Sequence, residues 1–132
     1  MKSLSALRVA LAVAFLQIGV VQVELPAAPD ITGRWWADIP NKTPVPGQHY
    51  TFEFKVDGST LTGTVDSEGG RRAIEEGHVA GETISFVELV VFDSDLIRIE
   101  YSGVVSGDEI RFTRTVEDYE SEQFIARRSV TL

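Results

Sequence analysis

Two oppositely charged residues stand at matching positions of an internal repeat. The segment 77–86 aligns with the segment 103–112, and continuing each copy by two residues reaches Glu88 in the first and Arg114 in the second. Apolar residues at every second position mark the interior face of a β-strand, and the two charges continue that face. A buried charge without a partner is very costly. We therefore expect Glu88 and Arg114 to form an ion pair inside the fold, in the room that Gly103 leaves.

This pair has two interpretations. Pockets for small molecules are mostly apolar and contain a few convergent polar groups. Glu88 and Arg114, with the inward-facing Tyr101 between them in the chain, are therefore candidate binding residues that would anchor a ligand at the floor of a cavity. The simpler interpretation is structural, with a satisfied ion pair that closes the interior and binds nothing.

Three residues near the chain ends predict closure and a surface contact. Trp35 and Arg128 both have inward parity. If the first and last strands pair, the guanidinium can stack on the indole, a contact that stabilises by about 1 kcal/mol or more when desolvated. We interpret this pair as a structural closure. Trp36 has the opposite parity, so we expect it partly exposed on the outer wall, where it would stack on a sugar ring or cover the proline-rich segment 40–47.

The sequence lacks the patterns that support catalysis or metal binding. It contains no cysteine and no Gly-x-Ser-x-Gly motif. His49 and His78 do not form a close ligand pair, and the acidic residues lack the spacing of a calcium-binding loop. We predict that the chain is not an enzyme, has no catalytic residues, and uses no cofactor or metal.

Short runs with apolar residues at every second position indicate the strands that would place these side chains. Eight runs are expected, at residues 31–38, 48–57, 60–67, 71–79, 83–92, 96–105, 109–117 and 122–131. The mixed pattern of the fourth run indicates a β-bulge. Most connections are short and rich in Gly, Asp and Ser, so consecutive strands should be antiparallel neighbours.

The expected fold is therefore all-β, an eight-stranded antiparallel up-and-down (meander) barrel. An open meander would leave two unpaired edge strands, and pairing the first strand with the last removes them. A barrel of eight strands is either filled by its own side chains or holds one small ligand.

The N-terminus has the character of an export signal. A positive start with Lys2 and Arg8 precedes an apolar run at 9–21, and small residues follow at 27 and 28. This arrangement is typical of a signal peptide. We predict a signal peptide at 1–28, a single β-barrel domain at 29–132, and a secreted or periplasmic location. If the leader is not cleaved, it would anchor the chain in a membrane, because a helix over 7–23 nearly spans a bilayer.

The composition limits the classes of partner. The chain has 20 acidic and 12 basic residues and a formal net charge of −8. Such a surface repels phosphates, so we expect no nucleic acid partner. An exported domain without cysteine must be held together by packing and hydrogen bonds, which favours a closed sheet.

Several segments resemble a small bacterial secreted β-barrel domain that occurs alone or appended to extracellular carbohydrate-active hydrolases. They are residues 32–35, 50–58, 84–88, 110–114 and 124–128. The Gly33-Arg34-Trp35 start with the late Arg128 is more distantly similar to the lipocalin pattern, in which a Trp and an Arg close one end of an eight-stranded cup. The resemblance implies a calycin-like barrel and supplies no established activity to transfer.

The function that we expect is that of a non-catalytic extracellular binding or accessory module. Its partner would be a small apolar ligand in the barrel, or a glycan or protein on the outer wall. The alternative is a purely structural or interaction barrel with a filled core. A third option is a hydrolase-associated domain whose enzyme label belongs to its neighbours.

Overall fold

The computed structural model describes residues 30–39 and 48–130. The predicted leader at 1–28 and the segment 40–47 lie outside the described residues. The strands are β1 (Gly33–Ile39), β2 (Gln48–Asp57), β3 (Thr60–Ser67), β4 (Gly70–Ala73), β5 (Glu75–Ala80), β6 (Thr83–Phe92), β7 (Asp95–Ser106), β8 (Glu109–Val116) and β9 (Glu122–Arg128). No helix within the described ranges is long and apolar enough to cross a membrane.

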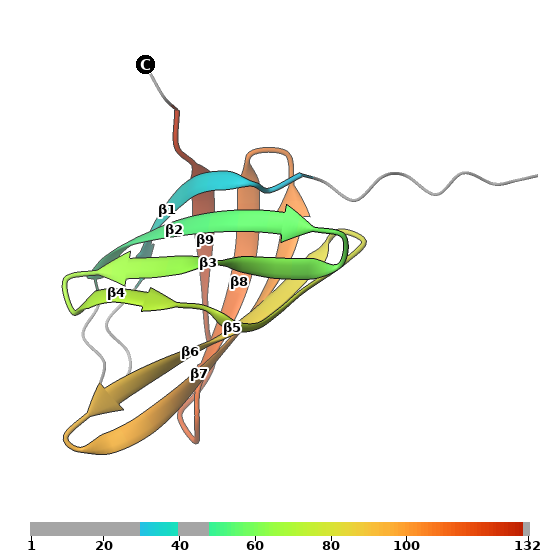
Figure 1. Cartoon of the computed structure of the whole chain (residues 1–132). Helices are drawn as coiled ribbons and strands as arrows, with labels where there is room; N and C mark the ends of the chain where they lie inside the picture. The colour runs from blue at the N-terminus through green and yellow to red at the C-terminus, as the bar shows by residue number, and fades with distance from the viewer. Residues whose placement is uncertain (1–29, 40–47, 131–132) are drawn as a thin grey trace, which may run out of the picture.

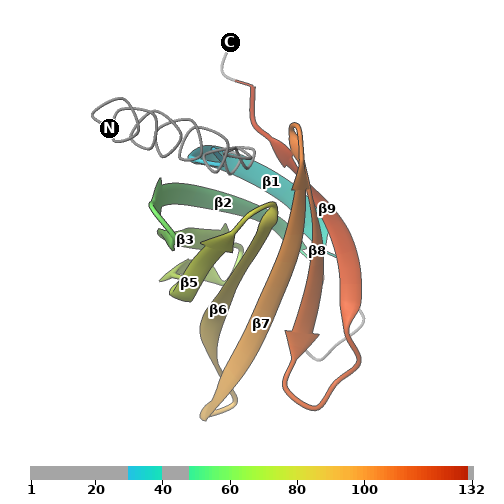
Figure 2. The same cartoon turned by 90° about the vertical axis from the view of Figure 1, so that its right-hand side faces the viewer.

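These strands form one closed antiparallel barrel (Figures 1 and 2). Around the barrel they follow the order β2, β1, β9, β8, β7, β6, β5 and β3, and β3 pairs with β2 to complete the circle. The short β4 pairs with the second half of β3, whereas β5 pairs with its start, so β4 and β5 share one position in the wall. The predicted eight-stranded antiparallel barrel is confirmed.

The predicted fourth strand is interrupted rather than continuous. Ile74 separates β4 from β5, and the pairing of β5 with β6 shifts between Glu75 and His78. Within this bulge Glu76 has a φ of 51°, and a Cβ on Gly77 would lie 1.9 Å from the carbonyl oxygen of Leu61. A glycine at position 77 allows the backbone of β5 to pass this close to β3, beside the shift in register. The expected bulge is thus present.

The first and last strands pair with each other and so help to complete the circle of strands. β1 pairs with β9 through Trp35 opposite Arg128 and Trp36 opposite Arg127. The amide of Ser129 also donates a hydrogen bond of 2.9 Å to the carbonyl of Arg34. The predicted first-to-last pairing is therefore confirmed.

Aromatic side chains fill the centre of the barrel. The ring of Phe52 is fully buried, and its centroid lies 5.6–6.4 Å from those of six other aromatic rings. These rings belong to Tyr50, Phe54, Phe86, Tyr101, Phe112 and Phe124. They come from strands on different sides of the barrel, so their contacts hold the walls together. The middle of this barrel is a packed core.

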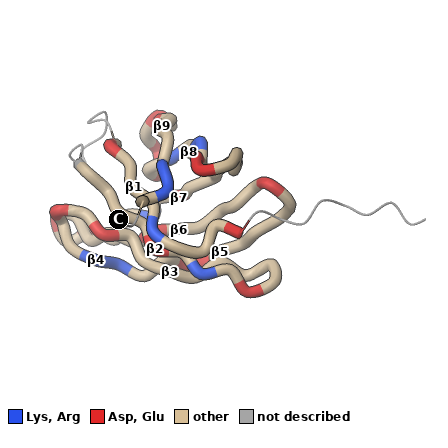
Figure 3. The backbone as a smooth tube through the Cα atoms, turned by 90° about the horizontal axis from the view of Figure 1, so that it is seen from above, with Lys and Arg blue, Asp and Glu red and all other residues tan. Residues whose placement is uncertain are grey.

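Charged residues are spread around the wall. Figure 3 shows Lys and Arg interspersed with Asp and Glu over the strands and turns.

No group of three or more His, Cys, Asp or Glu side chains in the described part of the chain is placed to hold a metal ion.

Candidate functional site

Glu88 and Arg114 both lie inside the barrel, as their strand positions predict, but they do not pair with each other. Glu88 is 1% exposed and Arg114 is fully buried. One oxygen of Glu88 accepts a 2.8 Å hydrogen bond from the Tyr101 hydroxyl, and the other lies 3.6 Å from Nη1 of Arg72. Arg114 instead donates from Nη1 to Glu122 Oε1 at 2.7 Å. The predicted direct ion pair was therefore wrong, and each charge has another partner.

The register of the sheet explains this correction. Tyr101 on β7 lies opposite both Phe86 on β6 and Arg114 on β8. Glu88 is two residues further along β6, opposite Ile99. Glu88 and Arg114 occupy equivalent positions of the repeat. In the folded sheet, however, Arg114 is level with Tyr101 of β7 and Glu88 is level with Ile99, the next inward-facing residue of that strand.

Six side chains make up what we call the buried polar cluster. They are Tyr50, Arg72, Glu88, Tyr101, Arg114 and Glu122. Nη2 of Arg114 donates to the Tyr50 hydroxyl at 3.3 Å, and its guanidinium carbon lies 5.4 Å and 5.8 Å from the ring centroids of Tyr50 and Tyr101. The cluster brings together three of the predicted binding residues, Glu88, Arg114 and Tyr101, and separates them from Trp36.

The other three members, Tyr50, Arg72 and Glu122, were not predicted from the sequence as site residues. Glu122 lies directly opposite Arg114 in the pairing of β8 with β9, and it shares the inward parity of Phe124. This shared parity could have predicted that Glu122 points into the barrel. Arg72 lies in the run whose faces the bulge obscured, so no regular alternation was available to place it.

Three buried polar atoms of the cluster have no hydrogen-bond partner among the described residues. They are Oε2 of Glu88, Nε of Arg114 and Oε2 of Glu122. The contact between Glu88 Oε2 and Arg72, at 3.6 Å, is an ion pair beyond hydrogen-bond distance. Because buried polar groups are nearly always hydrogen-bonded, this concentration of unpaired atoms is unusual.

Burial and neighbouring groups shift the pKa of three side chains in the cluster. Desolvation raises the pKa of the Tyr101 hydroxyl well above its usual 10.0, and the nearby charge of Glu88 raises it further. Burial also raises the pKa of Tyr50, against the opposing effect of Arg114. Desolvation acts to lower the pKa of Arg114, but the two tyrosines and Glu122 outweigh it and raise that pKa. At neutral pH both tyrosine hydroxyls therefore keep their protons, and Arg114 is a cation.

A pH dependence of stability follows from the raised tyrosine pKa. Below about pH 10 both Tyr101 and an unfolded tyrosine are protonated, so the stabilising contribution is complete. As the pH rises above that value, the unfolded chain loses the proton while the folded chain keeps it, and stability is lost. We expect Tm to fall less between about pH 9 and pH 11 in Tyr101→Phe than in wild type. Tyr119→Phe, at a side chain that is 52% exposed, should follow wild type; equal slopes in all three proteins would contradict the assignment.

Trp35 and Arg128 occupy the opposite end of the barrel from this cluster. The guanidinium carbon of Arg128 lies 4.4 Å from the ring centroid of the fully buried Trp35, whose indole N–H donates to the Ile31 carbonyl at 2.9 Å. Arg128 also donates to the carbonyls of Asp30 and Thr32 at 3.0 Å and 3.3 Å. The arginine thereby ties the entering chain to the last strand.

Trp36 lies on the outer wall and is half-buried. The His49 ring stacks beside it at 5.7 Å, and the Arg127 guanidinium carbon is 6.0 Å from its ring centroid. It borders an open hollow of 540 Å³ between β1 and β9. The indole is therefore packed beside His49 and Arg127 and borders the hollow with its remaining surface.

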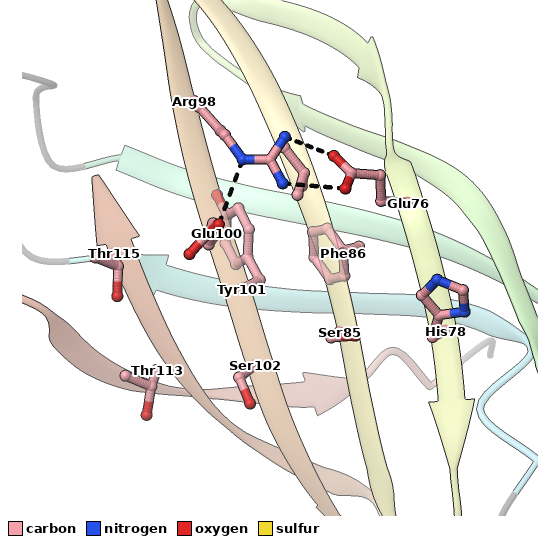
Figure 4. Close-up of a pocket in the computed structure, with 11 residues that line it drawn as sticks. Glu76, His78, Ser85, Phe86, Arg98, Glu100, Tyr101, Ser102, Thr113 and Thr115 are labelled. Carbon is pink, nitrogen blue, oxygen red and sulfur yellow. Dashed lines mark hydrogen bonds and ion pairs between the residues drawn. The ribbon is translucent and has the colours of Figure 1, made fainter. Parts of the chain in front are cut away.

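A second hollow on the outer wall was not predicted from the sequence. It measures 340 Å³ and lies over β5, β6, β7 and β8, with His78, Ser85, Ser102 and Thr113 among its lining residues (Figure 4). Outward polar residues at every second position are typical of any solvated sheet face. The sequence therefore contains no signal that distinguishes this hollow.

Comparisons with known proteins identify no family for this chain. No protein-family model matches the chain, and no curated protein matches its sequence. Among solved structures, a crystal structure of a variant of the fluorescent protein UnaG is similar over 76% of this chain and 97% of that chain, with 14% sequence identity and a TM-score of 0.48.

Proposed function

We propose that this chain is a non-catalytic binding module that works outside the cytoplasm, alone or beside extracellular hydrolase domains. It holds one small, largely apolar molecule by an uncharged polar head. One observation carries the proposal: the three unpaired buried polar atoms found in the described residues all belong to the buried polar cluster. Unpaired groups of this kind each cost about 1–3 kcal/mol unless something satisfies them.

The charges of the cluster favour a neutral head. Arg72 and Arg114 balance Glu88 and Glu122, so a charged group would add an uncompensated charge in a buried environment. The unpaired atoms are two carboxylate oxygens, which accept, and one guanidinium N–H, which donates. A head with both an N–H or O–H donor and an acceptor atom matches this set.

The apolar body of the molecule would lie beside the aromatic centre, towards one end of the barrel. The cluster forms the boundary between the aromatic centre and the barrel end that contains the β6–β7 turn, where Val90 faces Ile97. These two side chains point inward at 8% and 9% exposure, and Phe92, the next inward position of β6, is 44% exposed. A molecule whose head meets the cluster would place its apolar body against these three side chains, and small-molecule sites combine such apolar contacts with a few polar groups.

The alternative is a purely structural barrel. It is favoured by the continuous aromatic packing around Phe52, which leaves the cluster as a hydrogen-bonded closure completed by ordered water. The two functions differ in whether an apolar molecule binds next to the cluster.

Titration with N-phenyl-1-naphthylamine distinguishes them. This probe is uncharged, carries one N–H donor and fluoresces more strongly in apolar surroundings. Wild type should give a saturable rise in fluorescence, and Val90→Trp, which fills the lining above the cluster, should weaken probe binding at least tenfold. Glu88→Gln should weaken it by about tenfold, because a charged acceptor is replaced by a neutral one.

Val104→Trp is the matched control, because Val104 points outward and is 51% exposed. It should bind the probe as wild type does. Near-ultraviolet circular dichroism would verify that each variant is folded before its affinity is compared. Absence of saturable binding to wild type, or equal binding by Val90→Trp, would overturn the small-molecule function and leave the structural barrel.

A further inference from the structure

The hollow on the outer wall has one charged side that the fold holds in place. Arg98 of β7 donates from both terminal nitrogens to the two oxygens of Glu76 on β5, and its Nε donates to Glu100 at 3.3 Å. Figure 4 shows the Arg98 side chain extending across β6 to reach Glu76. Val87 of β6 has outward parity and yet is only 5% exposed. The bridge thus runs over the outer face of β6, where Val87 lies, and forms one side of the hollow.

A strained backbone position aims Glu76 at this bridge. Glu76 has a φ of 51°, which non-glycine residues seldom adopt, and it lies in the bulge of β5. Bulges of this kind redirect side chains. The hydrogen bonds from Arg98 lower the pKa of Glu76 below its usual value, so the carboxylate stays ionised at neutral pH. A strained backbone conformation at Glu76 thus accompanies the two hydrogen bonds that its carboxylate accepts from Arg98.

The floor of the hollow is a row of side chains that can form hydrogen bonds. In the sheet register His78 lies opposite Ser85, Ser85 opposite Ser102, and Ser102 opposite Thr113. The row continues to Gln123 on β9, which is opposite Thr113. With neighbouring strands about 4.8 Å apart, the row from β5 to β9 is roughly 19 Å long.

We propose that this hollow is a second binding site, and that it takes a neutral glycan chain. Its volume of 340 Å³ reaches the range of about 300–1,000 Å³ in which small-ligand pockets lie. Hydroxyl groups donate and accept hydrogen bonds, so a row of Ser and Thr complements the hydroxyls of a sugar. The charge of Arg98 is already used by Glu76 and Glu100, and an anionic ligand would meet the excess acidic charge of the wall.

A peptide is the less suitable occupant of this surface. β6, β7 and β8 have paired neighbours on both sides along the hollow, so no sheet edge is open there for an added strand. The floor also presents hydroxyls rather than an apolar pocket for a side-chain anchor. An extended, uncharged, hydroxyl-bearing polymer fits both the chemistry and the length of the row.

Isothermal titration with soluble xylan and mixed-linkage β-glucan tests the site, with polygalacturonate as the anionic comparison. We expect wild type to bind at least one of the two neutral glycans more tightly than polygalacturonate. The double variant Ser85→Val/Ser102→Val, which removes two hydroxyls and fills the floor, should lose at least tenfold in affinity. Thr62→Val, an exposed β3 position on another part of the outer wall, should bind as wild type does.

The glycan site and the small-molecule site can fail separately. Val90→Trp should retain glycan binding while it loses the fluorescent probe, and Ser85→Val/Ser102→Val should show the reverse. Circular dichroism and Tm would establish that the variants remain folded. Absence of neutral-glycan binding by wild type, preference for polygalacturonate, or unchanged affinity in the double valine variant would each overturn the glycan proposal.

Discussion

Replacing Arg114 by leucine should destabilise the barrel by about 3–5 kcal/mol, as is typical when one member of a buried ion pair is removed. The substitution leaves the Glu122 carboxylate, which is 5% exposed, without its cation and 2.7 Å hydrogen bond. It also removes the donor to the Tyr50 hydroxyl. Urea unfolding at neutral pH, followed by circular dichroism, measures the change.

The companion double variant separates the ion pair from packing. Arg114→Leu/Glu122→Leu removes both charges and should recover most of the lost stability, because apolar replacements of a buried pair are often neutral or stabilising. Arg34→Leu is the exposed comparison; Arg34 pairs with Glu53, and both side chains are substantially exposed, so we expect a loss of about 1 kcal/mol or less. A double variant as unstable as Arg114→Leu alone would contradict this account.

Gly63→Ala should be the other most damaging substitution, and we expect a loss of more than about 4 kcal/mol or no folded protein. Gly63 has a φ of 152°, and an added Cβ would lie 1.8 Å from the carbonyl oxygen of Glu53 on β2. The obstacle is backbone in a paired strand, so it cannot be relieved by a change of rotamer. Soluble yield and thermal unfolding would measure the effect.

Gly58→Ala is the matched control for this prediction. Gly58 also has a positive φ, of 62°, but nothing lies within 4 Å of the position of its Cβ. The cost there is the conformational one alone, about 1–2 kcal/mol. If Gly63→Ala were no more destabilising than Gly58→Ala, the close approach of β2 and β3 at this position would be wrong.

The two proposed sites use opposite faces of the same wall. Tyr101 points into the buried polar cluster, while the adjacent Ser102 on β7 points into the outer hollow. Alternation along a strand keeps the side chains probed by substitution at the two sites on opposite faces, and Tyr101 is the cluster residue that also borders the hollow. We therefore expect substitutions at one site to leave ligand affinity at the other unchanged.

Residue alternation determined the parts of this protein that depend on local periodicity. The turns and the apolar residues at every second position predicted the antiparallel barrel, the inward direction of Glu88 and Arg114, and the pairing of Trp35 with Arg128. Each conclusion needs only the two-residue period of a strand and the cost of an open edge. The mixed pattern at 71–79 likewise indicated the bulge, although not the residues that it redirects.

Tertiary structure decided which of these side chains meet. Glu88 and Arg114 acquired separate partners because strand register offsets them, and register is a property of the assembled hairpins rather than of either copy of the repeat. Arg72, the partner of Glu88, comes from the interrupted segment β4, and Glu122, the partner of Arg114, comes from the neighbouring strand β9. The outer hollow depends in the same way on the Glu76 bulge and on Arg98 reaching across β6. Contacts of this kind depend on the register of the assembled sheet, so alternation fixes the face of a residue but leaves its neighbour across the sheet undetermined.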